Sequence, residues 1–438
     1  MANIIARDLR HLWHPCSQMK DYEDFPPLVV KKAYGPYLEL ENGRLIIDAM
    51  SSWWCKSLGH SHPRLKQALF KQAEKFSHVI LANTTHEAIV DLSEKLAGLT
   101  PSLNKVFYTS DGSCAVEVAM KMSLHARLLS GETQRQRFIA LSNSYHGETC
   151  GALSVSDVGI YRDPYQALLF KSFFILNIPY VTGKHDPLWH DCSESWVIIE
   201  KQLEQQAEYT TAVIVEPVLQ SAGGMLVYSP DFLRRLRQWT QKNNIYFIAD
   251  EIMTGMGRTG LPLACQHAGI EPDFLCLGKG LTSGWLPLSA VLTSDAIYKL
   301  FYDDYEKGKS FLHSHTYSGN ALAVSIALEC LSIMEEENIY TQVINNEMYF
   351  WELMADIAHK TGRLKNIRGI GAVIAADLIT DNPKQRLGYA VYRKAVELGA
   401  LLRPLGNTIY WAPPLNCDRS ILRDLHDITL EAINLTVV

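Results

Sequence analysis

The sequence has no long hydrophobic run, no cluster of basic residues and no paired-cysteine motif. Its longest uncharged apolar stretches have the length of strands, well short of the roughly 20 residues that a membrane helix needs. The segment from Met1 to Pro15 mixes Arg7, Asp8 and Arg10 into its apolar residues, which is not the pattern of a secretory signal. We therefore expect no membrane association and a cytoplasmic location.

The charge balance argues against another class of partner. The 438 residues include 41 Lys and Arg and 47 Asp and Glu, a formal net charge of −6. A negative chain without a Lys/Arg-rich run is poorly suited to neutralise phosphates, so we expect no nucleic-acid partner. Apolar residues make up 47% of the chain and charged residues 20%, which excludes disorder as its main state.

The cysteines and histidines do not form a metal-binding or disulfide pattern. The nine cysteines are an odd number, are scattered, and include no C-x-x-C, so we expect reduced thiols in a folded core. Histidines occur two apart at His60/His62 and His313/His315, without an accompanying cluster of acids or cysteines. We predict no metal site.

The chain begins with a β-rich part. Two short apolar runs, 37–41 and 44–48, flank Asn42-Gly43. This dipeptide between such runs predicts a hairpin in which both turn residues take positive φ.

From about residue 100, strands alternate with helices, and Ser229-Pro230-Asp231 is typical of a helix start. This alternation predicts an α/β domain with a mostly parallel sheet. We expect an N-terminal segment (1–60) that contributes to a small domain, a large α/β domain (61–320) and a C-terminal α+β domain (321–438). The predicted strands of the large domain are Val106–Thr109, Phe138–Leu141, Ala212–Val215, Ile245–Ala249, Phe274–Leu277 and Leu288–Leu292.

Two charged residues follow strands of this sheet. Asp250 comes directly after the strand 245–249, and Lys279 follows the strand 274–277 between two glycines. Ligands of such sheets bind beyond the carboxyl ends of the strands. An acid and an amine at that edge are candidates for a shared site, although either alone is more often a solvated surface charge.

Two further elements fall at strand ends. Gly112 and Ser113 open a helix, whose N-terminal N–H groups can hold a phosphate. Tyr145 and His146 are adjacent rings that could stack on a planar ligand. With the acid and the amine, these residues supply what pyridoxal 5′-phosphate (PLP) needs: an amine for its carbonyl, an acid for its pyridinium proton, a phosphate seat and an aromatic lid.

A competing motif is Gly255–Gly260, which matches the G-x-G-x-x-G of dinucleotide-binding folds. That interpretation requires a helix that opens at the glycines and an acid about 20 residues further on. Pro262 follows too soon for such a helix, so we reject a dinucleotide-binding site here.

Two segments of the chain resemble the sequence signature of a known enzyme family. The segments Ala249–Gly260 and Pro272–Gly280 resemble the signature of class III aminotransferases, and the resemblance covers nearly the whole chain. It implies the fold-type I architecture of PLP enzymes, with a mostly parallel seven-stranded sheet in the large domain and a smaller α+β domain. It also implies a homodimer with shared active sites.

Within that class, four segments are similar to the branch that converts 8-amino-7-oxononanoate to 7,8-diaminononanoate in biotin biosynthesis. They are Leu12–Pro15, Met50–Trp54, Ala115–Lys121 and Leu402–Pro404. The resemblance implies a ping-pong reaction between the PLP and pyridoxamine forms. Most members of the branch take the amino group from S-adenosylmethionine and some take it from lysine.

The resemblance also implies roles for individual residues. Lys279 would bind the cofactor covalently and carry the substrate proton, and Asp250 would pair with the ring nitrogen. Tyr145 would stack on the ring and act with them in catalysis. The remaining cofactor-binding candidates are Gly112, Ser113, His146, Glu216 and, from the neighbouring subunit, Thr316; the substrate-binding candidates are Trp53, Trp54, Tyr145, Lys279, Arg403 and Tyr410.

Two positions depart from the pattern of the branch. Cys16 follows His14-Pro15 where an aromatic residue is usual, and His315 precedes Thr316 where proline is common. The amine donor therefore stays open between S-adenosylmethionine and lysine. Other open alternatives are a class III ω-aminotransferase for ornithine, 4-aminobutyrate or a diamine, an aminomutase, and a non-catalytic protein of the same fold.

Overall fold

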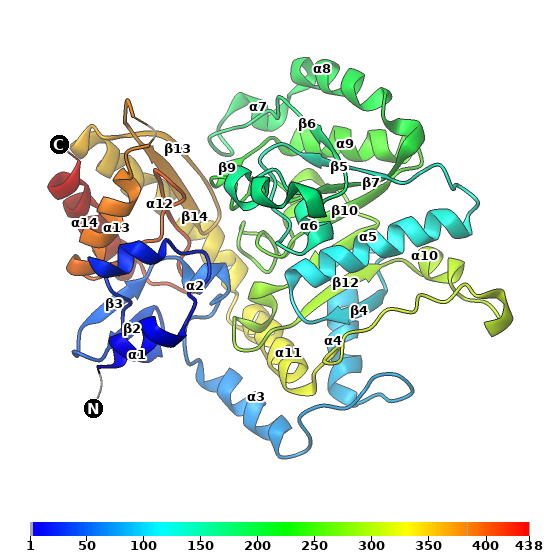
Figure 1. Cartoon of the computed structure of the whole chain (residues 1–438), viewed down its shortest axis with the longest axis horizontal. Coiled ribbons are helices and arrows are strands. Elements are labelled where there is room, and N and C mark those ends of the chain that lie inside the picture. The colour runs from blue at the N-terminus through cyan, green and yellow to red at the C-terminus, as the bar shows by residue number, and fades with distance from the viewer. Residues whose placement is uncertain (1–2, 383, 438) are drawn as a thin grey trace.

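A mixed seven-stranded sheet forms the centre of the larger part of the molecule (Figure 1). The computed structural model describes residues 3–382 and 384–437. The strand order is β4-β12-β11-β10-β7-β5-β6, and β12 is antiparallel to both of its neighbours while the other pairs are parallel. The predicted mostly parallel sheet is confirmed. Its strands are β4 (Lys105–Thr109), β5 (Arg137–Leu141), β6 (Phe173–Ile175), β7 (Thr210–Val215), β10 (Tyr246–Asp250), β11 (Phe274–Leu277) and β12 (Ser289–Thr293).

Helices cover both faces of this sheet. Alternate strand residues face opposite sides, so Ile214 and Val213 of β7 belong to different apolar clusters. One cluster contains the buried side of α5 (Gly112–Leu129), and the other contains that of α9 (Pro230–Lys242). All six residues of β7 are buried. Burial on both faces explains why these strands are continuous apolar runs in the sequence.

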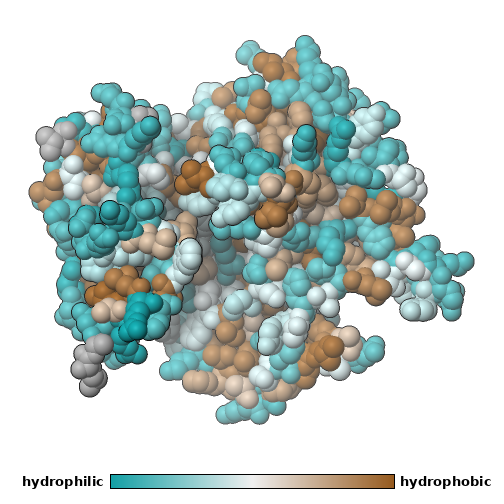
Figure 2. All heavy atoms as spheres, viewed as in Figure 1, coloured by the Kyte–Doolittle hydropathy of each residue, from teal (hydrophilic) through white to brown (hydrophobic). Residues whose placement is uncertain are grey.

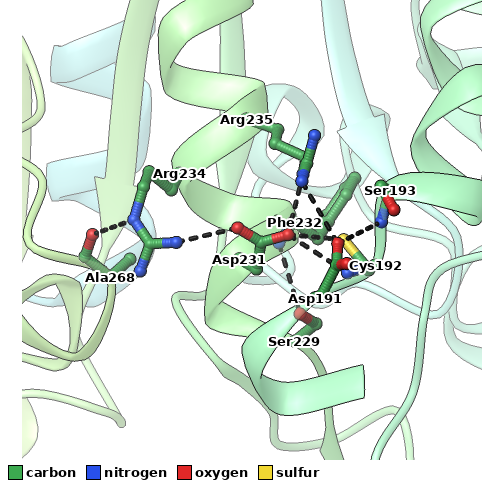
Figure 3. Close-up of polar contacts among 9 residues, drawn as sticks. All are labelled: Asp191, Cys192, Ser193, Ser229, Asp231, Phe232, Arg234, Arg235 and Ala268. Carbon is green, nitrogen blue, oxygen red and sulfur yellow. Dashed lines mark hydrogen bonds and ion pairs between the residues drawn. The ribbon is translucent and has the colours of Figure 1, made fainter. Parts of the chain in front are cut away.

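The start of α9 is as predicted (Figure 3). The Ser229 side chain accepts a hydrogen bond from the N–H of Phe232 at 3.3 Å, which satisfies a free donor of the first turn. The carboxylate of Asp231 accepts from the N–H of Cys192 at 3.1 Å and pairs with Arg235 at 2.7 Å. The contact with Cys192 joins α9 to the segment before α8 (Ser193–Glu204), and the pair with Arg235 holds Asp231 within α9.

Smaller sheets combine the two ends of the chain. β15 (Ala400–Leu401) pairs in parallel with β3 and so extends the N-terminal meander. The meander consists of β1 (Val30–Tyr34), β2 (Tyr37–Leu40) and β3 (Leu45–Asp48), and a further antiparallel sheet consists of β13 (Leu364–Ile370), β14 (Val373–Leu378) and β16 (Thr408–Trp411).

The β2–β3 hairpin corrects one prediction. Gly43 has φ +82°, but Asn42 does not have a positive φ. The N–H of Leu40 donates to the carbonyl of Arg44, and the Asn42 side chain accepts from the N–H of Arg44 at 3.1 Å. The loop is thus longer than a two-residue turn, and the Asn42 side chain supports it by a local hydrogen bond.

The remaining elements surround these sheets. α11 packs against α3 and α4, and α12 packs against β13 and α14. These other elements are α1 (Ile4–His11), α2 (Ser51–Trp54), α3 (Pro63–Ala73), α4 (Glu87–Ala97), α6 (Cys150–Ser154), α7 (Pro187–His190), β8 (Leu219–Gln220), β9 (Leu226–Val227), α10 (Asp295–Leu300), α11 (Ala321–Glu336), α12 (Ile339–Thr361), α13 (Leu387–Leu398) and α14 (Arg419–Thr436).

The glycine-rich segment 255–260 forms turns and no helix. It therefore lacks the helix that a dinucleotide-binding motif would need. Its Arg258 is buried and donates to the carbonyl of Pro413 at 2.6 Å, so this segment links the seven-stranded sheet to the C-terminal part of the chain. Figure 2 shows a hollow in the surface between these two parts. No helix among the described residues is long and apolar enough to cross a membrane.

Candidate active site

A cavity of about 410 Å³ lies at the carboxyl ends of the parallel strands. Its walls come from segments that follow β4, β5, β7, β10 and β11. Seven of the predicted site residues line it: Gly112, Ser113, Tyr145, His146, Glu216, Asp250 and Lys279. Residues up to 167 positions apart in the sequence (279 − 112) thus meet at one edge of the sheet.

Asp250 and His146 form a buried pair in this cavity. Asp250 ends β10, and its Oδ2 lies 2.8 Å from Nδ1 of His146. Oδ1 accepts from the backbone N–H of Ile252 at 3.2 Å. The backbone N–H of His146 donates to Ser156 Oγ at 2.9 Å. Both residues are nearly inaccessible to solvent. The stacking of the imidazole on the cofactor stays a prediction, and in the structure the imidazole fixes the orientation of the Asp250 carboxylate.

Glu216 holds the backbone of Tyr145. One carboxylate oxygen accepts from the N–H of Tyr145 at 2.9 Å, and the other accepts from Ser221 N–H at 2.9 Å and Ser221 Oγ at 2.8 Å. Burial raises the pKa of Glu216. The Tyr145 hydroxyl donates to Glu148 at 3.1 Å, so both ends of the tyrosine are anchored.

Lys279 enters the cavity from a strained backbone position. The residue has φ +41°, in the left-handed region that non-glycine residues rarely adopt. Its Nζ lies 4.8 Å from the ring centroid of Trp54. Removal from water lowers the pKa of Lys279 from its ordinary value, because a desolvated ammonium is disfavoured. A larger fraction of the amine is therefore neutral and nucleophilic.

The start of α5 forms a close-packed corner of the cavity. Asp111 caps the helix by accepting from the N–H of Cys114 at 3.1 Å. A Cβ on Gly112 would lie 2.9 Å from Ile252, and a Cβ on Gly147 would collide with Ser113. Only glycine lets these segments approach, which leaves the first N–H groups of an 18-residue helix facing the cavity.

The other predicted substrate residues, Trp53, Trp54, Arg403 and Tyr410, form a second group beside this cavity. Trp54 donates its indole N–H to the hydroxyl of Tyr410 at 3.2 Å, and through Lys279 it touches the cavity. The guanidinium of Arg403 lies 4.5 Å from the ring centroid of Trp53 and donates to the carbonyl of Cys16. Arg403 and Cys16 line a separate cavity of about 330 Å³.

Thr316 lies apart from both groups. It is exposed and does not line the 410 Å³ cavity of its own chain. His78 is hydrogen-bonded to its carbonyl at 2.8 Å. The predicted phosphate contact of Thr316 across subunits stays a prediction.

Sequence reasoning missed several residues in or beside the cavity. Ser221 and Glu148 anchor the predicted pair Glu216 and Tyr145, and Ile252 forms the wall against Gly112. The acid three residues after Tyr145 was a visible signal for Glu148. Ser221 had none, because its contact with Glu216 depends on the turn that joins β7 to β8.

The cavity residues fit PLP. The fixed carboxylate of Asp250 suits a protonated ring nitrogen, the helix start at Gly112 suits a phosphate, and Lys279 supplies the amine. Within residues 3–382 and 384–437, no three His, Cys, Asp or Glu side chains are grouped so that they could hold a metal ion.

Comparisons with known proteins agree with this chemistry. Residues 18–433 match the model of the family described as aminotransferase class-III. An adenosylmethionine-8-amino-7-oxononanoate aminotransferase from Helicobacter pylori is 42% identical over 94% of this chain and 93% of its own length.

Solved structures agree as well. The adenosylmethionine-8-amino-7-oxononanoate aminotransferase from Methanocaldococcus jannaschii superposes with a TM-score of 0.91 at 33% identity, over 99% of both chains. A PLP-bound amine transaminase from an uncultivated Pseudomonas species has a TM-score of 0.87 at 30% identity, over 97% of both chains. The chain belongs to the class-III aminotransferase family.

Proposed function

We propose that this aminotransferase converts 8-amino-7-oxononanoate to 7,8-diaminononanoate, a step of biotin biosynthesis, with S-adenosylmethionine as the amine donor. The observation that carries the proposal is the cavity in which Lys279 meets the Asp250–His146 pair beside Trp54. The names of relatives that share 30–42% identity over nearly the whole chain support the choice of substrate.

PLP is the cofactor, and it supplies the electron sink that lets a substrate carbon lose its proton. Asp250, oriented by His146, would hold the proton on the ring nitrogen. The N–H groups of Gly112 and Ser113 would bind the phosphate, and Tyr145 would cover the ring. Lys279 would hold the cofactor through Nζ, and once the amino group of the donor has displaced it there, its freed amine would take the Cα proton of the donor. A lowered pKa suits that amine to accept and return a proton near neutral pH.

The tryptophan group would bind the nine-carbon substrate. Trp53, which is partly exposed, offers apolar surface for the carbon chain, and Tyr410 fixes the buried Trp54 ring next to it. Arg403 offers a planar guanidinium for the substrate carboxylate. Among the described residues, Arg403 donates its side-chain hydrogen bond to the carbonyl of Cys16 and has no acidic partner.

We further propose a cytoplasmic homodimer with shared active sites. The segment after α10 extends away from the body (Figure 1) and carries Tyr305 and Leu312, which are 90% and 91% exposed. Such exposed apolar residues favour a partner surface. Thr316 follows on the same segment, so a second copy could bring it to the phosphate. Thr316→Ala should then weaken PLP binding about tenfold while a matched Thr316→Ser variant retains it.

Product formation tests the reaction. The PLP-loaded protein is incubated with 8-amino-7-oxononanoate and S-adenosylmethionine, and 7,8-diaminononanoate is measured by mass spectrometry, with Lys279→Ala as the control. Product that appears only with lysine would overturn the donor. Turnover of ornithine or 4-aminobutyrate with 2-oxoglutarate, without amination of the ketone, would overturn the substrate.

A further inference from the structure

Four consecutive non-glycine residues of α2 adopt a left-handed conformation. Ser51, Ser52, Trp53 and Trp54 have φ of 51°, 46°, 66° and 68°. Left-handed helical backbone is sterically unfavourable for each such residue. A run of four persists only where the surrounding structure holds it, and such strain is concentrated at functional sites.

The side chain that holds this turn is Asp48, the last residue of β3. It is fully buried and accepts three hydrogen bonds. The N–H and Oγ of Ser52 donate to it at 3.0 and 2.7 Å, and Nε2 of His60 lies 2.9 Å from its Oδ2. Burial by itself would raise the pKa of Asp48, but the hydrogen bonds from His60 and Ser52 keep it below the ordinary value. The carboxylate is therefore charged while it fixes the turn.

The turn directs its two tryptophans to different partners. Trp54 is 4% exposed and lies under Nζ of Lys279. Trp53 is 38% exposed and lies under the guanidinium of Arg403. One strained turn thus contacts both the catalytic amine and the predicted carboxylate clamp.

We propose that Asp48 and His60 are positioning residues, which hold the left-handed turn and thereby set Trp54 against Lys279 and Trp53 against Arg403. They act through the turn and form no contact with the reacting amine. The role of the Trp53–Arg403 contact rests on the proposed function, whereas the role of the Trp54–Lys279 contact rests on the aminotransferase chemistry alone.

A rescue experiment separates this role from general stability. Asp48→Ala removes all three hydrogen bonds and should lower kcat/KM about 100-fold. Glycine takes positive φ without steric cost, so Ser52→Gly added to Asp48→Ala should recover at least tenfold of that loss. Ser52 is exposed, so Ser52→Ala in the same background is the matched control, and it should recover nothing.

Spectroscopy provides readouts that do not depend on turnover. The near-ultraviolet circular dichroism of the PLP-free protein should lose tryptophan signal in Asp48→Ala and regain it only with Ser52→Gly. The pH at which the absorbance of the Lys279-bound cofactor titrates should shift and return in the same order. Equal behaviour of the glycine and alanine double variants would overturn the proposal, as would wild-type signals in Asp48→Ala.

Two further comparisons keep the test decisive. If Asp48→Ala does not fold, the milder Asp48→Asn, which keeps the size of the side chain and loses its charge, is compared alone and with Ser52→Gly or Ser52→Ala. Wild-type signals in Asp48→Asn, or equal recovery in the two double variants, would overturn the proposal. If the wild-type protein does not aminate 8-amino-7-oxononanoate, the proposed substrate fails, while the circular dichroism and the cofactor titration still decide the role of Asp48.

Discussion

Nδ1 of His146 and Oδ2 of Asp250 lie 2.8 Å apart, and both side chains are shielded from solvent. The two residues come from separate segments, one after β5 and the other at the end of β10. A carboxylate held in this way keeps one orientation beside the cavity.

Asp250→Asn should reduce kcat by about 10²–10³-fold, because the variant keeps the shape of the side chain and loses the charge that stabilises a protonated ring nitrogen. Rapid-mixing kinetics of the half-reaction with the donor alone measures this effect. PLP content is checked in parallel, so that weaker cofactor binding is not mistaken for slower chemistry. A variant with near-normal half-reaction rates would remove Asp250 from the role of ring-nitrogen partner.

Glu216→Gln should displace Tyr145. An amide has one acceptor oxygen, so its NH₂ group would face either the Tyr145 N–H or Ser221, donor against donor. We expect kcat/KM to fall about 10–100-fold, the equivalent of about one hydrogen bond to a charged group. Ser221→Ala removes only one of the three contacts and serves as the milder control. If the two variants behave alike, Glu216 does not position Tyr145.

Arg403→Ala should raise KM for 8-amino-7-oxononanoate about 10–100-fold and change kcat little, because the lost contact binds a remote carboxylate. Arg403→Lys should recover only part of the loss, since an ammonium cannot form the planar two-point contact. Steady-state kinetics at saturating donor gives both constants. A KM unchanged in both variants would place the clamp elsewhere.

Glu251 predicts a pH dependence of stability. Burial raises its pKa to about 7, although two backbone N–H groups, of Ala264 and Cys265, donate to its carboxylate. In the unfolded chain the pKa is about 4.3. Between these values the folded state keeps a proton that the unfolded state releases, so the free energy of unfolding falls as pH rises, by at most about 4 kcal/mol.

The check is the thermal unfolding midpoint at pH 5 and pH 7.5 in the wild-type protein and in Glu251→Gln. The variant has no group to titrate at this position, so its midpoint should fall less over the interval. Parallel changes in the two proteins would show that Glu251 titrates normally in the fold.

Much of the fold follows from local pattern. The predicted strands agree with the observed ones to within two residues at each end, since strands buried on both faces are continuous apolar runs. The cavity residues could be found for a related reason: Asp250 and Lys279 interrupt such runs at the edge where parallel strands end.

Features that depend on distant contacts could not be found in this way. The left-handed turn at Ser51–Trp54 contains no glycine, and it exists because Asp48 and His60 hold it. The backbone of Asn42 likewise follows from a hydrogen bond of its own side chain rather than from the dipeptide pattern. Local propensity favours other conformations at these positions, and contacts decide the outcome.

The most direct test of the account is the absorbance spectrum of the PLP-loaded protein before and after S-adenosylmethionine is added without a ketone acceptor. We predict loss of the visible band of the Lys279-bound cofactor and growth of the near-ultraviolet band of pyridoxamine phosphate, followed by return of the visible band when 8-amino-7-oxononanoate is added. A visible band that persists with S-adenosylmethionine, or one that does not return with the ketone, would contradict the proposed reaction.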